Sequence, residues 1–292
     1  MKTKILFIIL SFTTFCNAQI ITIPDVNFKI KLIGANSSNS IAKNLNGNYF
    51  KIDTNNDGEI QQSEANNVSE LFLYMPLNGT DYYITSVVGI LNFTNLTKLD
   101  VRYNRIVNMN ITGMQYLTYI DCSNNSQYLT SLTVENLPVL NTLYCQSAGS
   151  NTFTPFYSLL NLPLIKTINF NGCKFYNNTL ENLISLENIY GDGGLKSTVT
   201  TLDLSNKPNL KIVDLPQNNL TNLNIVANNI IEILTLSGND LTSFNKTLFT
   251  NLNKLDLSWN KFTSLTAQIG ELKNLTTLNL SRNQLTDRKT HV

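Results

Sequence analysis

The sequence contains little histidine and little charge. Its one histidine, His291, lies in the C-terminal tail, and no GxSxG, HExxH or glycine-rich phosphate loop is present. Charged residues make up 14% of the chain and the formal net charge is +1, so a basic surface for nucleic acid is missing. The carboxylates are scattered, and nothing in their spacing favours a glycosidase pair. We therefore expect a non-enzymatic protein that does not bind nucleic acid.

Long apolar segments are also missing. The run Ile5–Leu10 is too short to span a bilayer, and no second long run follows it. A basic start, this short apolar core and the small residue Ala18 are typical of a secretory signal peptide over residues 1–18. Lipidation of Cys16 is a weaker alternative, because the preceding residue, Phe15, is large. We expect a secreted or cell-surface protein with no membrane insertion after the signal is removed.

One pattern dominates the rest of the chain. The stretch Leu275-Thr-Thr-Leu278-Asn-Leu280-Ser-Arg-Asn283-Gln-Leu285 follows LxxLxLxxNxL, and near-copies recur at intervals of 21 to 25 residues. This pattern and period are typical of leucine-rich repeats. With the first leucine as position one, the anchors are Leu96, Leu117, Leu140, Ile165, Leu186, Leu210, Ile231, Leu252 and Leu275. The sequence predicts about nine coils over residues 96–285, followed by a tail over 286–292.

Most coils carry a second LxxLxL half about ten residues after the first, for example Leu129-Thr-Ser-Leu132-Thr-Val134. Asparagine, threonine and β-branched residues fill both halves, which disfavours helix. We therefore predict a β-rich solenoid, a leucine-rich-repeat arc or horseshoe with two extended segments in each coil. Helix is expected only in a small N-terminal cap and near Gln268–Lys273.

The register of the repeat assigns a role to its positions. Positions one, four and six should stack in the core, and position nine holds an asparagine whose buried amide should bond backbone groups of its own and the adjacent coil. Cys122 and Cys145 fall at position six, and Cys173 replaces asparagine at position nine. The three cysteines that follow the predicted signal peptide include no CxxC pair, which argues against a zinc site or a disulfide framework, so they are predicted to be core residues. A Cys122–Cys145 bridge is a minor alternative.

Residues 19–95 are predicted to form a cap over the apolar edge of the first coil. Residues 23–34 are expected to form a short helix, capped at Thr22 or its neighbour and ended by Gly34 in the left-handed conformation. Residues 84–90 look like a degenerate half-repeat that joins the cap to the array.

The cap contains the most specific local motif of the chain, Asp53-Thr-Asn55-Asn-Asp57-Gly58-Glu59-Ile60-Gln61-Gln-Ser-Glu64. It matches the EF-hand loop pattern D-x-[DN]-x-[DN]-G-x5-E at every specified position. The predicted calcium ligands are oxygens of Asp53, Asn55, Asp57, Glu59, Gln61 and Glu64, with Glu59 acting through its backbone carbonyl. Residues 44–50 are a poor entry helix, whereas residues 63–71 can be helical. We expect one structural calcium site rather than a paired sensor, and a polar turn without metal is the alternative.

Positions three, five, seven and eight are expected to face the concave surface of the arc. The candidate ligand-binding residues there are Tyr119, Asp121, Tyr144, Asn169, Tyr190, Asp214, Asp256 and Trp259. Exposed aromatic side chains bordered by polar groups on a rigid sheet favour binding of a protein or a glycan. The alternative is that tyrosine and threonine occupy these strands for their β propensity alone.

Four features together carry a family resemblance. They are Ile23-Pro-Asp-Val-Asn-Phe28, the loop that begins at Asp53, Leu117-Thr-Tyr-Ile-Asp-Cys-Ser-Asn-Asn125 and the 21-residue double-pattern coil. With them the chain resembles the secreted leucine-rich-repeat proteins of Bacteroidetes-type bacteria, and its architecture is similar to that of bacterial internalins. The resemblance implies a surface or secreted binding module. Many such proteins end in a sorting domain, whereas here the pattern runs to Leu285, so we expect a truncated form or a last coil that frays or pairs with a partner.

These features favour a secreted or cell-surface module that binds an extracellular protein, or mediates adhesion, through its concave face. A carbohydrate-binding or polysaccharide-associated protein is the alternative, and a structural surface protein is a third. Calcium is the only cofactor that the sequence predicts.

Overall fold

The computed structural model describes residues 19–75, 82–125, 128–146, 156–173, 180–193, 199–225, 230–245, 249–264 and 267–286. The predicted signal segment and nearly all of the predicted tail lie outside these residues, and the predicted domain boundaries stay predictions. No helix in the described part is long and apolar enough to cross a membrane.

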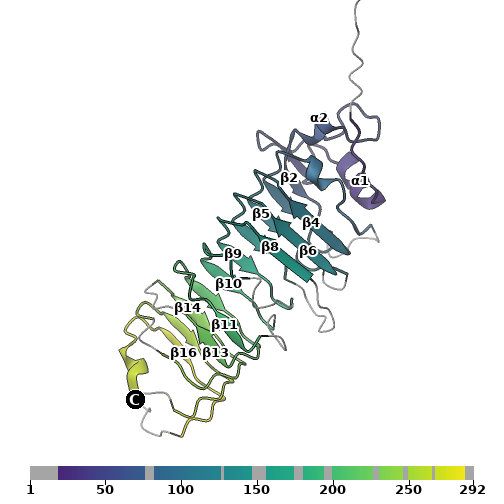
Figure 1. Cartoon of the computed structure of the whole chain (residues 1–292). Helices are drawn as coiled ribbons and strands as arrows, with labels where there is room; N and C mark the ends of the chain where they lie inside the picture. The colour runs from purple at the N-terminus through teal and green to yellow at the C-terminus, as the bar shows by residue number, and fades with distance from the viewer. Residues whose placement is uncertain are drawn as a thin grey trace, which may run out of the picture.

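The coils stack into an elongated solenoid (Figure 1). One 11-stranded sheet runs along it in the order β1-β2-β3-β5-β7-β9-β10-β12-β14-β15-β16. The pair β1–β2 is antiparallel and every later pair is parallel. The bounds are β1 (Ala42–Asn44), β2 (Val68–Phe72), β3 (Lys98–Asp100), β5 (Tyr119–Asp121), β7 (Thr142–Tyr144), β9 (Thr167–Asn169), β10 (Asn188–Tyr190), β12 (Ile212–Asp214), β14 (Ile233–Thr235), β15 (Lys254–Asp256) and β16 (Thr277–Asn279). The predicted β-rich leucine-rich-repeat solenoid is confirmed.

The apolar positions of the repeat form the core. From β3 onward, each strand of the long sheet begins two residues after a predicted anchor, so equivalent side chains of successive coils face each other across the parallel ladder. Leu99, Ile120 and Leu143, all at position four, pair in this way and are completely buried. Because each coil buries its apolar side chains only against its two neighbours, the core is a continuous column along the solenoid.

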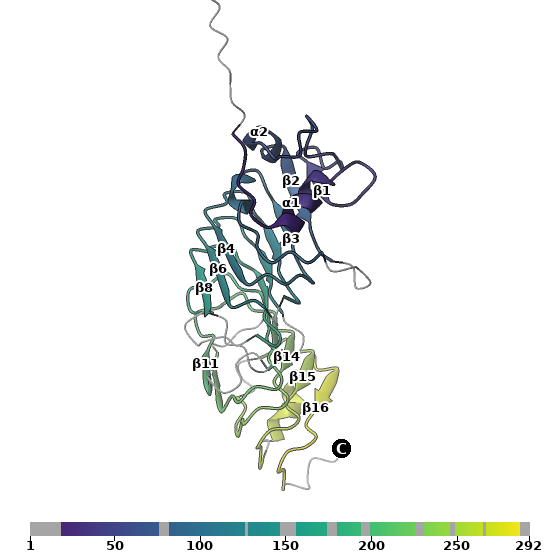
Figure 2. The same ribbon diagram turned by 90° about the vertical axis from the view of Figure 1, so that its right-hand side faces the viewer.

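The second half of the pattern forms two shorter sheets. In one, β4 (Asn108–Thr112), β6 (Ser131–Glu135) and β8 (Phe156–Leu160) pair in parallel, and in the other β11 (Thr201–Asp203) pairs with β13 (Asn222–Asn224). Figure 2 shows the solenoid bowed, with β3 and β14 to β16 on its inner side and β4, β6 and β8 on its outer side. The long sheet therefore lines the concave side, as predicted, and the outer extended segments form shorter sheets.

The asparagines at position nine hold neighbouring coils together. The Nδ2 of Asn239 donates to the carbonyl of Leu236 in its own coil and to that of Leu215 in the preceding coil, both at 3.0 Å. Its Oδ1 accepts the N–H of Leu220 at 2.9 Å. The same links to the own and preceding coils are made by Asn104, Asn125, Asn218, Asn260 and Asn283. The predicted role of position nine is confirmed.

Cys173 replaces this asparagine with a thiol that makes one of its bonds. Its Sγ donates to the carbonyl of Cys145, at position six of the preceding coil, at 2.7 Å. Cys122, Cys145 and Cys173 are all buried, and none of the three forms a disulfide bond. Burial raises the pKa of the Cys122 thiol well above its ordinary value, which disfavours the reactive thiolate. The cysteines are core residues, as predicted, and the minor alternative of a Cys122–Cys145 bridge is wrong for this structure.

Position eight takes an unusual backbone conformation that the repeat pattern did not reveal. Its φ is positive at Tyr103, Asn124, Gly172, Gly193, Gln217, Gly238, Trp259 and Arg282, with values between 55° and 70°. This left-handed turn reverses the chain so that the next side chain, at position nine, enters the core. β-Branched residues fit this conformation poorly, and none of these positions holds one.

The cap begins with α1 (Val26–Ile33), whose N-cap is Asp25 rather than Thr22. The Oδ1 of Asp25 accepts the N–H of Phe28 at 2.8 Å, and its Oδ2 accepts the N–H groups of Thr85 and Ser86 at 2.7 and 3.0 Å. Burial raises the pKa of Asp25, but these bonds and the Thr85 hydroxyl outweigh it and hold that pKa below its ordinary value. One carboxylate thus starts the helix and attaches it to the half-repeat at residues 84–90.

Two details of the predicted helices are wrong, and a third helix is present as a 3-10 helix. Gly34 ends α1 with φ −72°, in the right-handed region, because its N–H still bonds the carbonyl of Ile30. The exit segment is helical only over α2 (Gln62–Ala65) and continues as the strand β2. The helix expected near Gln268–Lys273 is a 3-10 helix, η4 (Ala267–Glu271), and η1 (Ile90–Asn92) is a second such turn.

The last described coil is less buried than those before it. Leu278, at position four, is 43% exposed, whereas its partner Leu255 on β15 is completely buried. β16 forms the edge of the long sheet, so its outer face has no following coil among the described residues.

Replacement of a position-nine amide is expected to destabilise the whole array. Asn239→Ala leaves two buried carbonyls and one buried N–H without their partner, so we predict a loss of about 2 kcal/mol in the free energy of unfolding. The matched control is Asn222→Ala, at an exposed position of β13, with an expected change below about 0.5 kcal/mol. Urea unfolding measures both, and equal losses would contradict the role assigned to position nine.

Candidate functional site

The predicted ligand-binding residues lie mostly in one row of the long sheet. The strand register aligns the position-five residues, which are Asp100, Asp121, Tyr144, Asn169, Tyr190, Asp214, Thr235, Asp256 and Asn279. Tyr119 belongs to the neighbouring position-three row, beside Lys98. Trp259 lies in the turn that follows β15, at position eight.

Aromatic and cationic side chains gather at the N-terminal end of this face. We call Tyr74, Lys98, Arg102, Tyr119 and Tyr144 the tyrosine patch. The rings of Tyr119 and Tyr144 meet edge to face, with centroids 5.7 Å apart and planes at 86°. The Nζ of Lys98 lies 4.7 Å from the Tyr119 centroid, and the Cζ of Arg102 lies 5.1 Å from that of Tyr74. The contacts hold these large side chains in defined orientations.

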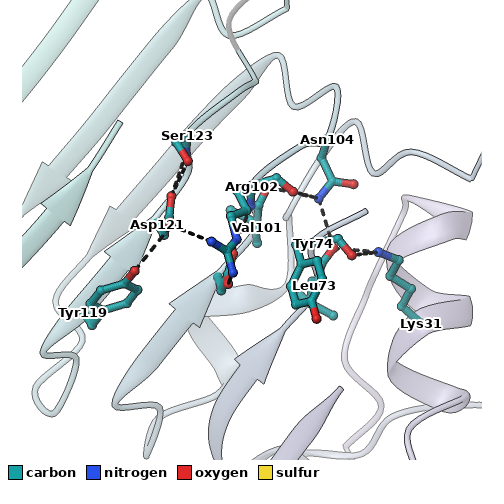
Figure 3. A network of polar contacts seen from close by, with 10 residues as sticks. Lys31, Leu73, Tyr74, Val101, Arg102, Asn104, Tyr119, Asp121 and Ser123 are labelled. Atoms are coloured by element: carbon teal, nitrogen blue, oxygen red, sulfur yellow. Dashed lines mark hydrogen bonds and ion pairs between the residues drawn. The ribbon is translucent and has the colours of Figure 1, made fainter. Parts of the chain in front are cut away.

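Arg102 connects the patch to two buried carboxylates, Asp100 and Asp121, and Figure 3 shows its contact with Asp121. Its Nη2 lies 3.0 Å from Oδ2 of Asp100, and its Nη1 lies 3.9 Å from Oδ2 of Asp121. The Oη of Tyr119 donates to the same Asp121 oxygen at 3.3 Å. The two aspartates are 3% and 4% exposed, whereas the Arg102 side chain is 40% exposed. The guanidinium therefore presents the positive charge of the group to solvent.

The buried aspartates correct part of the sequence interpretation, which expected position five to be exposed. Asp121 accepts the N–H and the hydroxyl of Ser123 at 3.0 and 2.6 Å, and Asp256 accepts the same two groups of Ser258 at 2.9 and 2.6 Å. A position-five carboxylate thus shapes the turn that leads to position seven. The sequence signal for this turn was an aspartate at position five followed by a serine at position seven, in the pattern Asp-x-Ser.

Burial and neighbouring charges shift the acidity of the site. Burial raises the pKa of Asp100, and the adjacent guanidinium of Arg102 only partly offsets it. Burial, followed by the charges of Asp121 and Asp100, raises the pKa of Tyr119 above its ordinary value. The phenol therefore stays protonated and keeps its hydrogen bond to Asp121.

The cap helix reaches the same region through Lys31. Its Nζ donates to the carbonyls of Leu73 and Tyr74 at 2.6 and 3.0 Å, while Asn104 donates to the Leu73 carbonyl at 3.0 Å. Burial lowers the pKa of Lys31 to about 8, against the raising influence of Asp100. Figure 3 shows this continuous polar network from α1 to Tyr119. The position of Tyr74 in the patch thus depends on the cap.

The remaining candidates lie further along the sheet. Tyr190 continues the row of position-five residues beyond Tyr144 and Asn169. It is half-buried, and burial, followed by the charges of Tyr144 and Asp214, raises its pKa. Trp259 is 61% exposed and Arg282 lies over its ring, 5.0 Å from the centroid. The structure therefore brings Tyr119, Asp121 and Tyr144 together, and Trp259 lies on a separate part of the array.

The predicted metal ligands occupy one tight loop and the α2 helix that follows it, where Glu64 lies. The Oδ2 of Asp53 accepts the N–H of Gly58 at 3.3 Å, and the Oδ1 of Asp57 accepts that of Glu59 at 2.9 Å. The N–H of Glu59 and the amides of Asn55 and Gln61 outweigh the effect of burial and lower the pKa of Asp57. In the described residues no three His, Cys, Asp or Glu side chains lie close enough together to hold a metal by themselves. Any metal here needs the amide and carbonyl oxygens as well.

Comparison with solved structures finds leucine-rich-repeat proteins. The functional domain of InlJ from Listeria monocytogenes, described as including a cysteine ladder, matches with a TM-score of 0.54 at 22% identity over 90% of this chain and 56% of that chain. The internalin InlF from the same organism matches with a TM-score of 0.41 at 16% identity over 91% and 92% of the two chains. The fold is a leucine-rich-repeat solenoid. At these identities the likeness concerns the fold alone, and this chain spans little more than half of the InlJ chain. No protein-family model and no curated protein matches the sequence.

Removal of the guanidinium should make Asp100 a weaker acid. Arg102→Ala deletes the nearest positive charge, so the pKa of Asp100, already raised by burial, is expected to rise further. Carboxyl-carbon NMR during an acid titration measures this shift. Arg282→Ala, next to Trp259, is the control. An unchanged or lowered pKa of Asp100 in Arg102→Ala would show that the ion pair does not act on it.

Lys31 should make stability depend on pH in an alkaline window. Its pKa is about 8 in the folded protein against 10.5 in the unfolded chain, so between these values the unfolded chain binds more protons and stability rises with pH. Lys31→Met removes this rise. Urea unfolding from pH 7 to 10.5 should therefore show native stability increasing relative to the variant. Parallel curves would contradict the lowered pKa.

Proposed function

We propose that this chain is a secreted or cell-surface binding module that recognises an extracellular protein through the tyrosine patch. The observation that carries the proposal is the combination of Lys98, Tyr119 and Tyr144 on strands of the long sheet with Tyr74 and Arg102 directly after two of its strands. Tyrosine and arginine contribute most to protein interfaces when they are held in place before binding, because little side-chain entropy is then lost.

The electrostatics of the patch suggest the chemistry of the partner. The carboxylates of Asp100 and Asp121 are buried and bonded within the protein, whereas Lys98 and Arg102 stand among the aromatic rings at the surface. The accessible charge is therefore positive. A partner that presents carboxylates beside apolar or aromatic side chains would complement it.

Glycan binding is the second candidate, and one observation makes it weaker. Sugar hydroxyls are usually recognised by accessible acceptors beside an aromatic face, and the two aspartates nearest Tyr119 are already bonded to Ser123, Arg102 and Tyr119 itself. Secretion, adhesion and the role of a structural surface protein rest on the N-terminal signal and the repeat pattern.

Binding assays with matched tyrosine variants test the proposal. Native protein is applied to arrays of extracellular protein domains and of glycans, and a protein ligand is expected. Tyr144→Ala should weaken that binding about 10-fold or more, because the ring forms half of the edge-to-face pair. Tyr116→Ala, which removes a tyrosine 58% exposed outside the sheet, should change it less than about twofold.

Thermal unfolding of both variants verifies that each is folded. Equal effects of the two substitutions would contradict the tyrosine patch as the binding surface. Ligands found only on the glycan array would favour the second candidate.

A further inference from the structure

We propose that the loop Asp53–Glu64 binds one Ca²⁺ and that the ion fastens the N-terminal segment and α1 to the first coil. None of the proposed ligands belongs to the tyrosine patch. Four observations carry the proposal: a buried carboxylate oxygen without a partner, the orientation of the loop side chains, replaceable contacts around Glu64, and the attachment of two other segments to the loop.

The first observation is the carboxylate of Asp53, which is 3% exposed. Its Oδ1 is buried and has no hydrogen-bond partner, while its Oδ2 accepts the N–H of Gly58 from the other side of the loop. The carboxylate therefore lies on the inner side of the loop. A buried carboxylate oxygen without a partner is costly, and a cation bound inside the loop would supply its missing contact.

The loop backbone turns other oxygens toward the same interior. Gly58 has φ +76°, a conformation that favours glycine, and it produces the sharp turn between Asp57 and Glu59. The Oδ1 of Asn55 accepts the N–H of Asp57 at 3.1 Å, which fixes this side chain along the loop. The side chain of Glu59 points outward to Lys29, so its backbone carbonyl is the group available to the ion.

The carboxylate of Glu64 accepts hydrogen bonds that a bound ion could replace. Its Oε1 accepts the N–H and hydroxyl of Thr54 at 2.6 and 2.8 Å, and its Oε2 accepts the N–H of Gln61 at 3.1 Å. Both oxygens thus already face the loop from the start of α2. A small rotation of this carboxylate toward Asp53 would complete a set of carboxylate, amide and carbonyl oxygens around a single cation.

Amide groups fill the remaining positions. The Nδ2 of Asn55 and the Nε2 of Gln61 donate to Oδ2 of Asp57 at 2.9 and 2.7 Å. Rotation of the Gln61 amide by half a turn exchanges its nitrogen for its oxygen and converts this donor into a ligand, while Oδ1 of Asn55 keeps a second lone pair for the ion. Several neutral oxygens in an irregular arrangement suit Ca²⁺, whereas Mg²⁺ requires a nearly ideal octahedron and keeps its water.

Two other segments of the cap depend on residues 59–62. The N–H of Ile21 donates to the carbonyl of Ile60, and the N–H of Gln62 donates to the carbonyl of Gln19, both at 2.8 Å. Lys29 of α1 pairs with Glu59. Ile60 is fully buried, so this half of the loop is part of the core. An ion that stiffens the loop would therefore stabilise the N-terminal segment and α1 together.

Calorimetry with CaCl₂ on the full chain, after removal of metal by a chelator, tests the site. We expect one ion per chain with a Kd of about 10⁻⁴ to 10⁻³ M. Saturating calcium should raise the Tm by about 3 °C or more. Asp53→Asn and Glu64→Gln should weaken binding about 10-fold or more, and so should Asp57→Asn, which changes an exposed side chain outside the core.

Glu59→Gln is the matched control, because it removes a charge of the same loop but keeps the backbone carbonyl. It should alter the affinity less than about twofold. Hydrogen exchange supplies the second readout: calcium should slow exchange at the amides of Ile21 and Gln62 about 10-fold, and not at Asn239.

Four results would overturn the proposal or one of its parts. If the folded native chain binds no calcium at millimolar concentration, the proposed site does not exist. If Glu59→Gln and Glu64→Gln weaken calcium binding equally, the ion is attracted by the charge of the loop and not held by the proposed ligands. If calcium leaves hydrogen exchange at the amides of Ile21 and Gln62 unchanged, the ion does not fasten the N-terminal segment. If magnesium binds as tightly as calcium, the choice of ion is wrong.

Discussion

The buried amide at position nine is the constraint on which the array depends. A parallel solenoid must turn its chain out of the long sheet once per coil, and each turn leaves backbone groups buried between two coils. Asn239 satisfies two carbonyls and one N–H in such a turn, across its own coil and the preceding one. Because the same side chain fixes the turn and joins the coils, stacking and strand register are determined together.

The left-handed residue before that amide is a consequence of the same constraint. Position eight must reverse the chain within one residue to point position nine inward, so it takes a positive φ even where it holds Trp259 or Arg282. The position-five carboxylates shape the approach to this turn, as Asp121 does through Ser123. Position-five carboxylates that the sequence suggested as surface ligands are thus hydrogen-bonded within the turn. The tyrosines and the cationic side chains are the groups that stay accessible.

The N-terminal cap has a second function besides covering the first coil. Asp25 attaches α1 to the half-repeat, and Lys31 joins the helix to the backbone beside Tyr74. Through Asn104 this network continues to Arg102 and the tyrosine patch. The cap is therefore joined by hydrogen bonds to the proposed binding surface.

The repeat pattern alone determined the fold class, the anchors, the core columns and the role of Asn239, because apolar periodicity and a buried amide leave a regular trace in the sequence. The EF-hand pattern likewise identified the residues of the loop that begins at Asp53. Only the tertiary structure decided that Asp100 and Asp121 are buried, that Tyr119 meets Tyr144 edge to face, and that Ile60 anchors the N-terminal segment. The physical reason is that burial and side-chain pairing depend on how the side chains of neighbouring coils pack in space. The sequence pattern does not contain this packing.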